Sequence, residues 1–407
     1  MTQKTTSQDI TGSSPGSGDD LPRPLAARGR IDPFIVMDVL RTANEKEADG
    51  ADIVHMEVGQ PGTPAPARVI EAAHAALENS RLGYTEALGI PELRERIAAH
   101  YKTRYGQSIS PERIVVTSGS SAGFVLAFLA ILDMGARVAV PTPGYPCYRH
   151  ILSALGVEAV TLETSARTRW APLPAQLCEL NEGQGLDALL MASPANPTGT
   201  MLVGDALPEL ARMCERLGIW FISDEIYHGL DYEEPAATAI AHSRFAIVIN
   251  SFSKYFSMTG WRIGWMVVPQ ALVRPIERLA QNLYICAPAL SQHAAIAAFD
   301  SIDELEANKA VYQVNRDLLL EELPKAGFTD ILPADGAFYL YADVRHMTND
   351  SADFAKAMLD EIGVAATPGV DFDTGRGTHY LRFCYSGTTE RMREAARRLR
   401  DWSNTRR

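Results

Sequence analysis

Lysine, cysteine and long apolar runs are all scarce in this sequence of 407 residues. The 38 Lys and Arg residues are outnumbered by 50 Asp and Glu, which gives a formal net charge of −12. Surfaces that bind nucleic acid or anionic membranes need an excess of basic residues. The longest apolar run, 122–132, is about half as long as the ~20 residues that a membrane-spanning helix needs. We therefore expect no nucleic-acid partner and no membrane.

The cysteines are few, odd in number and scattered, without a C-x-x-C pair or a spacing typical of metal ligands. They are Cys147, Cys178, Cys214, Cys286 and Cys384. No apolar segment typical of a secretory signal occurs near the first residue. We predict a cytoplasmic protein with reduced thiols and no metal site.

Short apolar runs alternate with helical segments between about residues 66 and 295. This order predicts an α/β fold with a mainly parallel sheet covered by helices on both faces. The region also contains expected helices over 124–132 and 206–217. The expected strands are 114–117, 137–140 (ended by Pro141), 157–162, 188–192, 219–223 and 246–250.

The pattern changes after residue 300 to that of a smaller α+β domain. Here we expect helices over 304–323, 352–362 and 389–402, and strands over 338–341 and 381–385. Residues 1–24 are polar and rich in Gly, Ser and Pro, which predicts a disordered tail. Residues 25–60, with a helix over 30–47 and a strand over 53–58, are expected to pack with the small domain 301–407. Residues 61–300 form the predicted large domain.

Lys254 differs from the six other lysines because it directly follows an expected strand, in the string Ser251-Phe252-Ser253-Lys254-Tyr255. Ligands of parallel sheets bind at the carboxyl ends of strands. An amine among aromatic and hydroxyl groups is placed to lose water, which lowers its pKa and makes it nucleophilic. The alternative is a lysine that covers apolar surface.

Two polar clusters follow other expected strands. Asp224 and Tyr227, three residues apart after strand 219–223, could hold a cationic ring nitrogen and a ring hydroxyl, although Asp224 could equally cap a helix. Asn196 lies between two prolines in a turn after strand 188–192, which either projects its amide into the crevice or is only structural.

Anion-binding groups are the third signal. Residues 118–121 (Ser-Gly-Ser-Ser) join a strand to a helix and offer free backbone N–H groups, without a dinucleotide or P-loop motif. Arg262 and Arg382 lie in apolar strings, where a guanidinium needs a phosphate, a carboxylate or an internal salt bridge.

Taken in order, these motifs resemble those of the class I/II aminotransferases, which are fold-type-I enzymes dependent on pyridoxal 5'-phosphate (PLP). The similarity extends from about residue 28 to 403, and the string S-F-S-K-Y-F-S-M-T-G-W-R-I-G is its most specific part. It implies a PLP-binding large domain and amino transfer from an L-amino acid to a 2-oxo acid by a ping-pong mechanism through pyridoxamine phosphate.

The resemblance also assigns roles to individual residues. Lys254 would form the Schiff base with PLP and move the proton during transfer. Asp224 would pair with the pyridine nitrogen, Tyr227 and Asn196 would bind the ring hydroxyl, and Tyr145 would stack on the ring where many relatives carry Trp.

The remaining roles concern the phosphate and the substrate carboxylate. Arg382 would bind the α-carboxylate with help from Asn196 and the backbone of Gly59. Tyr84 matches a tyrosine that relatives send across a dimer interface to the partner's phosphate, which implies a homodimer with shared active sites. The phosphate would be held by Ser120, Ser121, Ser251, Ser253 and Arg262.

Substrate choice rests on one departure from the family pattern. The aspartate-using bacterial branch carries a lysine at the position of Ser121, so we predict that aspartate is a weaker donor here than alanine, methionine or an aromatic amino acid. Another cation could still replace that lysine.

Other reactions occur on the same fold. C–S β-lyases commonly carry a histidine where this chain has Ala195, which favours transamination, and acyl-transferring relatives carry D-x-A-H where this chain has D-E-I-Y. Aminocyclopropane-carboxylate synthases share the motifs and stay open. A regulator with this fold would need a DNA-binding module, for which the short acidic tail offers no room. A binding protein without turnover also stays open.

Overall fold

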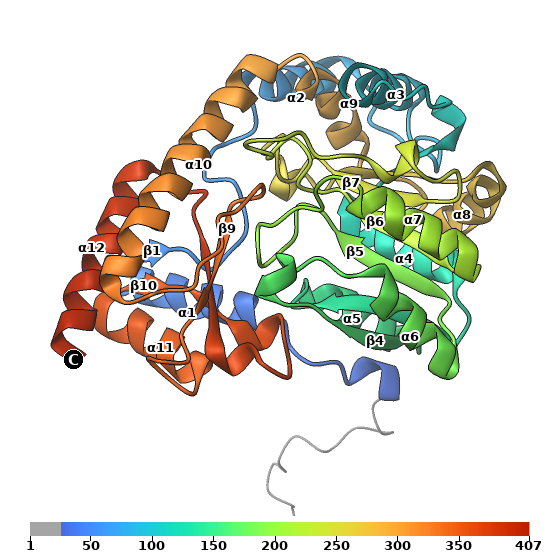
Figure 1. The fold of residues 1–407 in the computed structure, drawn as a ribbon. Coiled ribbons are helices and arrows are strands. Elements are labelled where there is room, and N and C mark those ends of the chain that lie inside the picture. The colour runs from blue at the N-terminus through green and yellow to red at the C-terminus, as the bar shows by residue number, and fades with distance from the viewer. Residues whose placement is uncertain (1–25, 407) are drawn as a thin grey trace, which may run out of the picture.

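A seven-stranded sheet forms the centre of the molecule in the computed structural model, which describes residues 26–406 (Figure 1). Its strand order is β2-β8-β7-β6-β5-β3-β4, and all neighbours are parallel except β8, which is antiparallel to both β2 and β7. The strands are β2 (Ile114–Thr117), β3 (Arg137–Thr142), β4 (Glu158–Glu163), β5 (Ala188–Ala192), β6 (Trp220–Asp224), β7 (Ile247–Ser251) and β8 (Gly264–Val267). The predicted α/β fold with a mainly parallel sheet is confirmed.

Helices cover both faces of this sheet, and the inner strands β5, β6, β7 and β8 are accordingly buried and mostly apolar, whereas the edge strand β4 is partly exposed. The helices α4 (Gly119–Ile131), α5 (Pro146–Ala154) and α8 (Gln270–Leu283) contribute to one apolar core. The other core takes in α2 (Ala67–Asn79), α3 (Pro91–Tyr105), α6 (Pro174–Gln184), α7 (Ala206–Leu217) and α9 (Ala289–Ala298).

A second group of elements follows residue 300 and lies beside the sheet (Figure 1). Its antiparallel three-stranded sheet has the order β11-β12-β9. The elements are α10 (Ile302–Glu322), β9 (Tyr339–Asp343), α11 (Ser351–Ile362), β10 (Val364–Ala365), β11 (Thr367–Pro368), β12 (Tyr380–Cys384) and α12 (Thr389–Arg406).

The N-terminal segment lies among these late elements: α1 (Ile35–Ala48) and β1 (Val54–His55) are the blue elements beside α11 and α12 in Figure 1. β1 pairs in parallel with β10, Val54 opposite Val364. The domain boundaries at residues 60 and 300 stay a prediction, and the predicted tail 1–24 lies outside the described residues.

Several predicted boundaries are wrong: the strand expected over 53–58 is only β1, Val54–His55, and the helix expected over 124–132 begins at Gly119. Two other differences have clear physical reasons. The first helix begins at Ile35 rather than residue 30. Pro33 disfavours a helical backbone at the residue before it, so the helix starts only after this proline. Pro141 does not end its strand. β3 pairs with β5 only at Val138 and Ala139, and from there on its only neighbour is β4. Since one side of the strand is unpaired at Pro141, the missing backbone N–H of the proline is tolerated.

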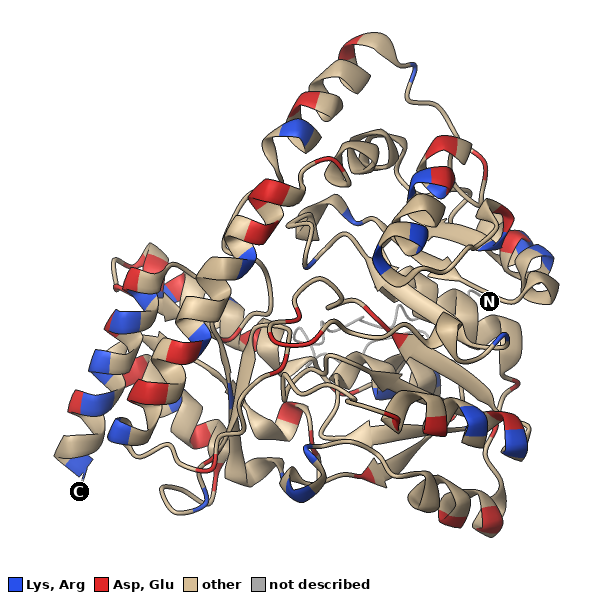
Figure 2. Ribbon diagram, turned by 45° about the horizontal axis from the view of Figure 1, so that its top comes forward, with Lys and Arg blue, Asp and Glu red and all other residues tan. Residues whose placement is uncertain are grey.

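Charged residues of both signs alternate along the outer helices α10 and α12, whereas the central strands carry few of them (Figure 2). The net charge of −12 is therefore spread over the outer surface. Within residues 26–406, no helix combines the length and the hydropathy that a membrane span requires.

Candidate active site

One cavity brings together most of the predicted site residues, between the carboxyl ends of the central strands, α1 and the small sheet. Lys254, Asp224 and Asn196 reach it from the segments that follow or end β7, β6 and β5. The other predicted residues on its wall are Gly59, Ser120, Ser121, Tyr145, Tyr227, Ser253, Arg262 and Arg382. Residues up to 323 positions apart in the chain thus meet in one crevice.

Lys254 is half-buried, and its Nζ donates a hydrogen bond to the carbonyl oxygen of Gly59. Burial lowers the pKa of this amine to about 8, and the positive charges of Arg382 and Arg262 act in the same direction. Compared with an exposed lysine, the neutral and nucleophilic fraction at neutral pH rises by roughly a hundredfold or more. The amine is therefore suited to attack a carbonyl or to take a proton.

Asp224 ends β6 as a buried carboxylate. One oxygen accepts a hydrogen bond from the hydroxyl of Tyr148, and the other accepts one from the N–H of Ile226 at 3.0 Å. Burial raises the pKa of Asp224 to about 6, so a cation beside it would restore its ordinary acidity. No helix begins directly after Asp224, since the next helical turn starts at Ala239, so the alternative interpretation as a helix cap is wrong.

Arg382, on β12, is 2% exposed. Its partners within the described part of the chain are uncharged: it donates to Asn196 Oδ1 at 2.9 Å, to Thr367 Oγ1 at 3.1 Å and to the carbonyl oxygen of Glu57. Its Nε has no partner there. A guanidinium buried without a carboxylate is costly, so an internal salt bridge does not account for Arg382 and an anionic ligand would.

The N-terminus of α4 and Arg262 form a second group of side chains and N–H groups suited to an anion. A Cβ added to Gly119 would lie 2.5 Å from Arg262 Nη2, so only glycine allows the guanidinium so close to the first turn of the helix. Ser120 and Ser121 belong to this turn, and Ser253 lies on the same wall. Free helix N–H groups, hydroxyls and a guanidinium are the groups that bind phosphate.

Gly59 and Tyr145 complete the wall near these groups. A Cβ at Gly59 would lie 1.8 Å from the hydroxyl of Tyr339, which explains why glycine is required there. The ring of Tyr145 meets the rings of Phe34 and Tyr148 edge-on, with centroids 5.7 and 5.3 Å apart.

Two predicted residues are not on this wall. Ser251 lies behind it, with its Oγ 2.8 Å from Ser253 Oγ and donating to the carbonyl oxygen of Ile263 at 3.0 Å. Tyr84 is 83% exposed and borders a separate hollow with Ser118 and Tyr284.

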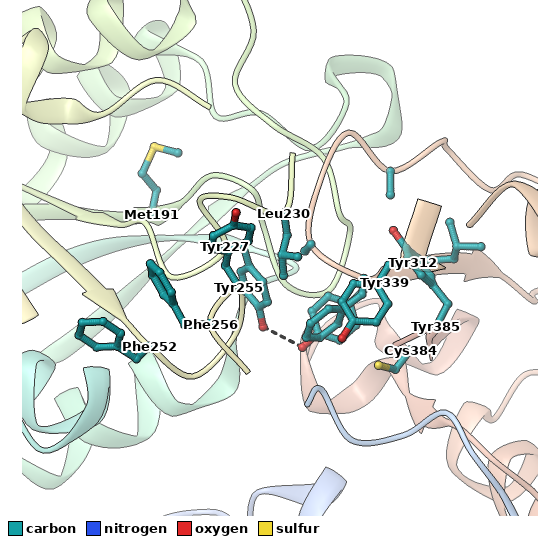
Figure 3. Packing of buried hydrophobic residues seen from close by; sticks show 14 of the residues in the cluster. Met191, Tyr227, Leu230, Phe252, Tyr255, Phe256, Tyr312, Tyr339, Cys384 and Tyr385 are labelled. Atoms are coloured by element: carbon teal, nitrogen blue, oxygen red, sulfur yellow. Dashed lines mark hydrogen bonds between the residues drawn. The ribbon is translucent and has the colours of Figure 1, made fainter. Parts of the chain in front are cut away.

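Sequence reasoning missed Tyr339, at the start of β9. Its hydroxyl lies 2.7 Å from that of Tyr227 (Figure 3), and Arg382 Cζ lies 4.4 Å from the centre of its ring. Phe372 approaches the same guanidinium, 4.7 Å from its ring centre. Tyr339 therefore connects Tyr227 to Arg382. Only its position in an aromatic string could have suggested this, because such strings are typical of any buried strand.

We expect the conservative change Tyr339→Phe to lower kcat with little change in the KM for the substrate. The Phe ring still packs on Arg382, whereas the hydroxyl of Tyr227 loses a partner worth about 1 kcal/mol, or roughly a tenfold effect at most. Steady-state kinetics beside Tyr339→Ala, which also removes the ring, checks this. A raised KM with unchanged kcat in Tyr339→Phe would contradict it.

The comparisons with known proteins agree with this geometry. Residues 51–399 match the family described as aminotransferase class I and II. The chain is 47% identical over 382 residues to a valine–pyruvate aminotransferase of Mycobacterium tuberculosis, covering 93% of this chain and 98% of the relative.

Solved structures show the same similarity. An aminotransferase structure from Mycobacterium tuberculosis has a TM-score of 0.92 at 46% identity and covers 94% of this chain and 100% of its own. The aspartate aminotransferase of Thermus thermophilus with maleate has a TM-score of 0.88 at 31% identity, with 93% and 99% covered.

Proposed function

We propose that this chain, which belongs to the aminotransferase class I and II family, whose members depend on PLP, uses an uncharged, apolar L-amino acid as its amino donor. The enzyme transfers an amino group from an amino acid to a 2-oxo acid. The observation that carries the proposal is the set of charges on the cavity wall: apart from Lys254, the described lining residues include only two cations, Arg262 and Arg382.

The cavity wall suits PLP at three points. Arg262 and the first turn of α4 match the phosphate, with Ser120, Ser121 and Ser253 beside them. Asp224 is a buried carboxylate whose raised pKa calls for a cationic partner such as a protonated ring nitrogen. Tyr227 and Asn196 would bind the ring hydroxyl, Tyr145 would stack on the ring, and Ser251 would support Ser253 from behind.

When bound, PLP supplies a carbonyl carbon that amines attack and a ring that withdraws electrons from the substrate Cα. Arg382 and Asn196 would hold the α-carboxylate, with Gly59 beside them. Neutral Lys254 Nζ would then take the proton from Cα, and its pKa of about 8 suits a base near neutral pH. The hydrogen bonds from Tyr148 and Ile226 hold the carboxylate of Asp224 in place during the proton transfer.

Each unpaired guanidinium on the wall then has one anion to bind, Arg262 the phosphate and Arg382 the α-carboxylate. A distal carboxylate such as that of aspartate would meet neither. Much of the remaining wall is apolar and comes from Phe34, Val36, Met37, Leu40 and Val58. Burying an unpaired charge there is costly, whereas an alkyl side chain gains from burial.

We expect valine and alanine to exceed aspartate in kcat/KM by at least about tenfold, since an unpaired buried charge costs more than 1.4 kcal/mol. Initial rates with 2-oxobutyrate as a fixed acceptor measure this. Ser121→Lys, which restores the cation of the aspartate-using branch, should raise kcat/KM for aspartate and leave valine's unimproved. Aspartate as the best donor of the unmodified enzyme would overturn the proposal.

The single guanidinium available for an α-carboxylate also supports a ping-pong order, because amino acid and 2-oxo acid would compete for Arg382.

A homodimer fits the exposed Tyr84, which borders a hollow shared with Tyr284 near the α4 turn at Ser118. The neighbouring Leu283 and Ile285 are 49% and 47% exposed, as apolar interface residues would be in a monomer. Five free cysteines accord with a cytoplasmic location.

A further inference from the structure

The first two turns of α1, with Phe34 directly before them, form much of the apolar part of the cavity wall. Phe34, Val36, Met37 and Leu40 all line the cavity, and the ring of Phe34 contacts that of Tyr145 edge-on at 5.7 Å. A helix end can define the shape of a pocket only if its position is fixed.

α1 has no capping residue of its own. Phe34 precedes it, and the side chain of Phe34 cannot accept a hydrogen bond. The N–H groups of Ile35 and Val36 instead donate to the two carboxylate oxygens of Asp371, at 3.1 and 3.2 Å. Asp371 is fully buried, and a carboxylate at a helix N-terminus also interacts favourably with the helix dipole.

The segment that carries Asp371 is fixed by contacts with α5 and with the residues just before it. Arg149 Nη2 on α5 donates to the carbonyl oxygen of Asp371 at 2.6 Å. The N–H of Gly144, next to Tyr145, donates to the carbonyl oxygen of Phe372 at 3.0 Å. The ring of Phe372 packs on Arg382. Two consecutive residues thus connect the apolar wall to the proposed carboxylate site.

We propose that Asp371 is a positioning residue that sets donor selectivity, because it fixes the start of α1, whose apolar side chains share the cavity wall with Arg382. This inference rests on the proposed donor class. Alanine has only a methyl group to place near this wall, whereas valine depends on the wall for its branched side chain. Loss of Asp371 should therefore lower kcat/KM for valine more than kcat/KM for alanine.

The test measures kcat/KM for valine and for alanine, with 2-oxobutyrate as acceptor, in the unmodified enzyme, Asp371→Ala and Asp371→Asn. We expect Asp371→Ala to lower kcat/KM for valine about fivefold to tenfold and kcat/KM for alanine less than about twofold. The larger effect lies within the range expected for the loss of a helix cap. Asp371→Asn, which keeps one acceptor oxygen, should lie in between and keeps the test available if the Ala variant does not fold.

Asp350→Ala is the matched control. Asp350 also caps a helix, α11, where its Oδ1 accepts from the N–H groups of Ala352 and Asp353, and that helix does not line the cavity. Asp350→Ala should leave the ratio of kcat/KM for valine to kcat/KM for alanine unchanged. Equal losses for both donors in the Asp371 variants, or no loss, would overturn the inference. An unmodified enzyme inactive with both donors would instead overturn the proposed donor class.

Discussion

Replacing Lys254 by alanine should lower the rate of amino transfer by roughly 10⁴-fold or more, because one change removes both the nucleophile and the base. The cavity keeps the groups proposed for the phosphate and the ring, so the variant should still bind PLP, without a covalent bond. Rates with valine and 2-oxobutyrate, together with the visible absorbance of the holoenzyme, measure both effects.

Lys102→Ala provides the control for this change. Lys102 lies on α3, is exposed and does not line the cavity, so its loss should leave the rate and the absorbance as they are. A Lys254→Ala enzyme that kept a tenth of the original rate would contradict the role proposed for this amine.

The second large effect concerns Arg382, whose replacement by alanine should reduce kcat/KM for the amino acid by about 10²- to 10³-fold. The estimate corresponds to losing one partner of a buried, charge-assisted pair, about 2–5 kcal/mol. Asn196 and Glu57 also lose their common donor. Absorbance titration with PLP should show nearly unchanged cofactor affinity, because Arg382 bonds Asn196, Thr367 and Glu57 and none of the residues proposed to bind the phosphate.

Arg382→Lys separates charge from geometry. It keeps a positive charge but cannot donate two parallel hydrogen bonds to a carboxylate, so it should recover only part of the loss. If Arg382→Ala weakened PLP binding and left the KM for the amino acid unchanged, the proposed division of the cavity into a phosphate end and a carboxylate end would be wrong.

Local patterns in the sequence were enough to predict the central sheet and several of the polar residues on the cavity wall, whereas Gly59 and Tyr145 were predicted only from the family resemblance. Lys254, Asp224 and Asn196 each follow a strongly apolar strand, and parallel strands necessarily bring their carboxyl ends to one edge. The prediction that Arg382 binds an anion also rests on a local feature, because a guanidinium within an apolar string needs an anionic partner wherever it lies in the fold.

Residues whose roles depend on distant partners could not be predicted in this way. Asp371 binds N–H groups 335 and 336 residues away, and Tyr148 lies in a helix whose pattern gives no sign of Asp224. Tyr339 looks like any strand aromatic until Tyr227 is seen beside it. The start of α1 and the path of β3 through Pro141 likewise depend on neighbours that periodicity does not reveal.

The central claim is that one buried amine, Lys254, holds the cofactor beside the phosphate-binding turn of α4. Borohydride reduction of the PLP-loaded enzyme, followed by digestion and peptide mapping, locates the modified lysine directly. We predict the label on Lys254 alone among the seven lysines of the chain. Label on any other lysine, or none at all, would contradict the account.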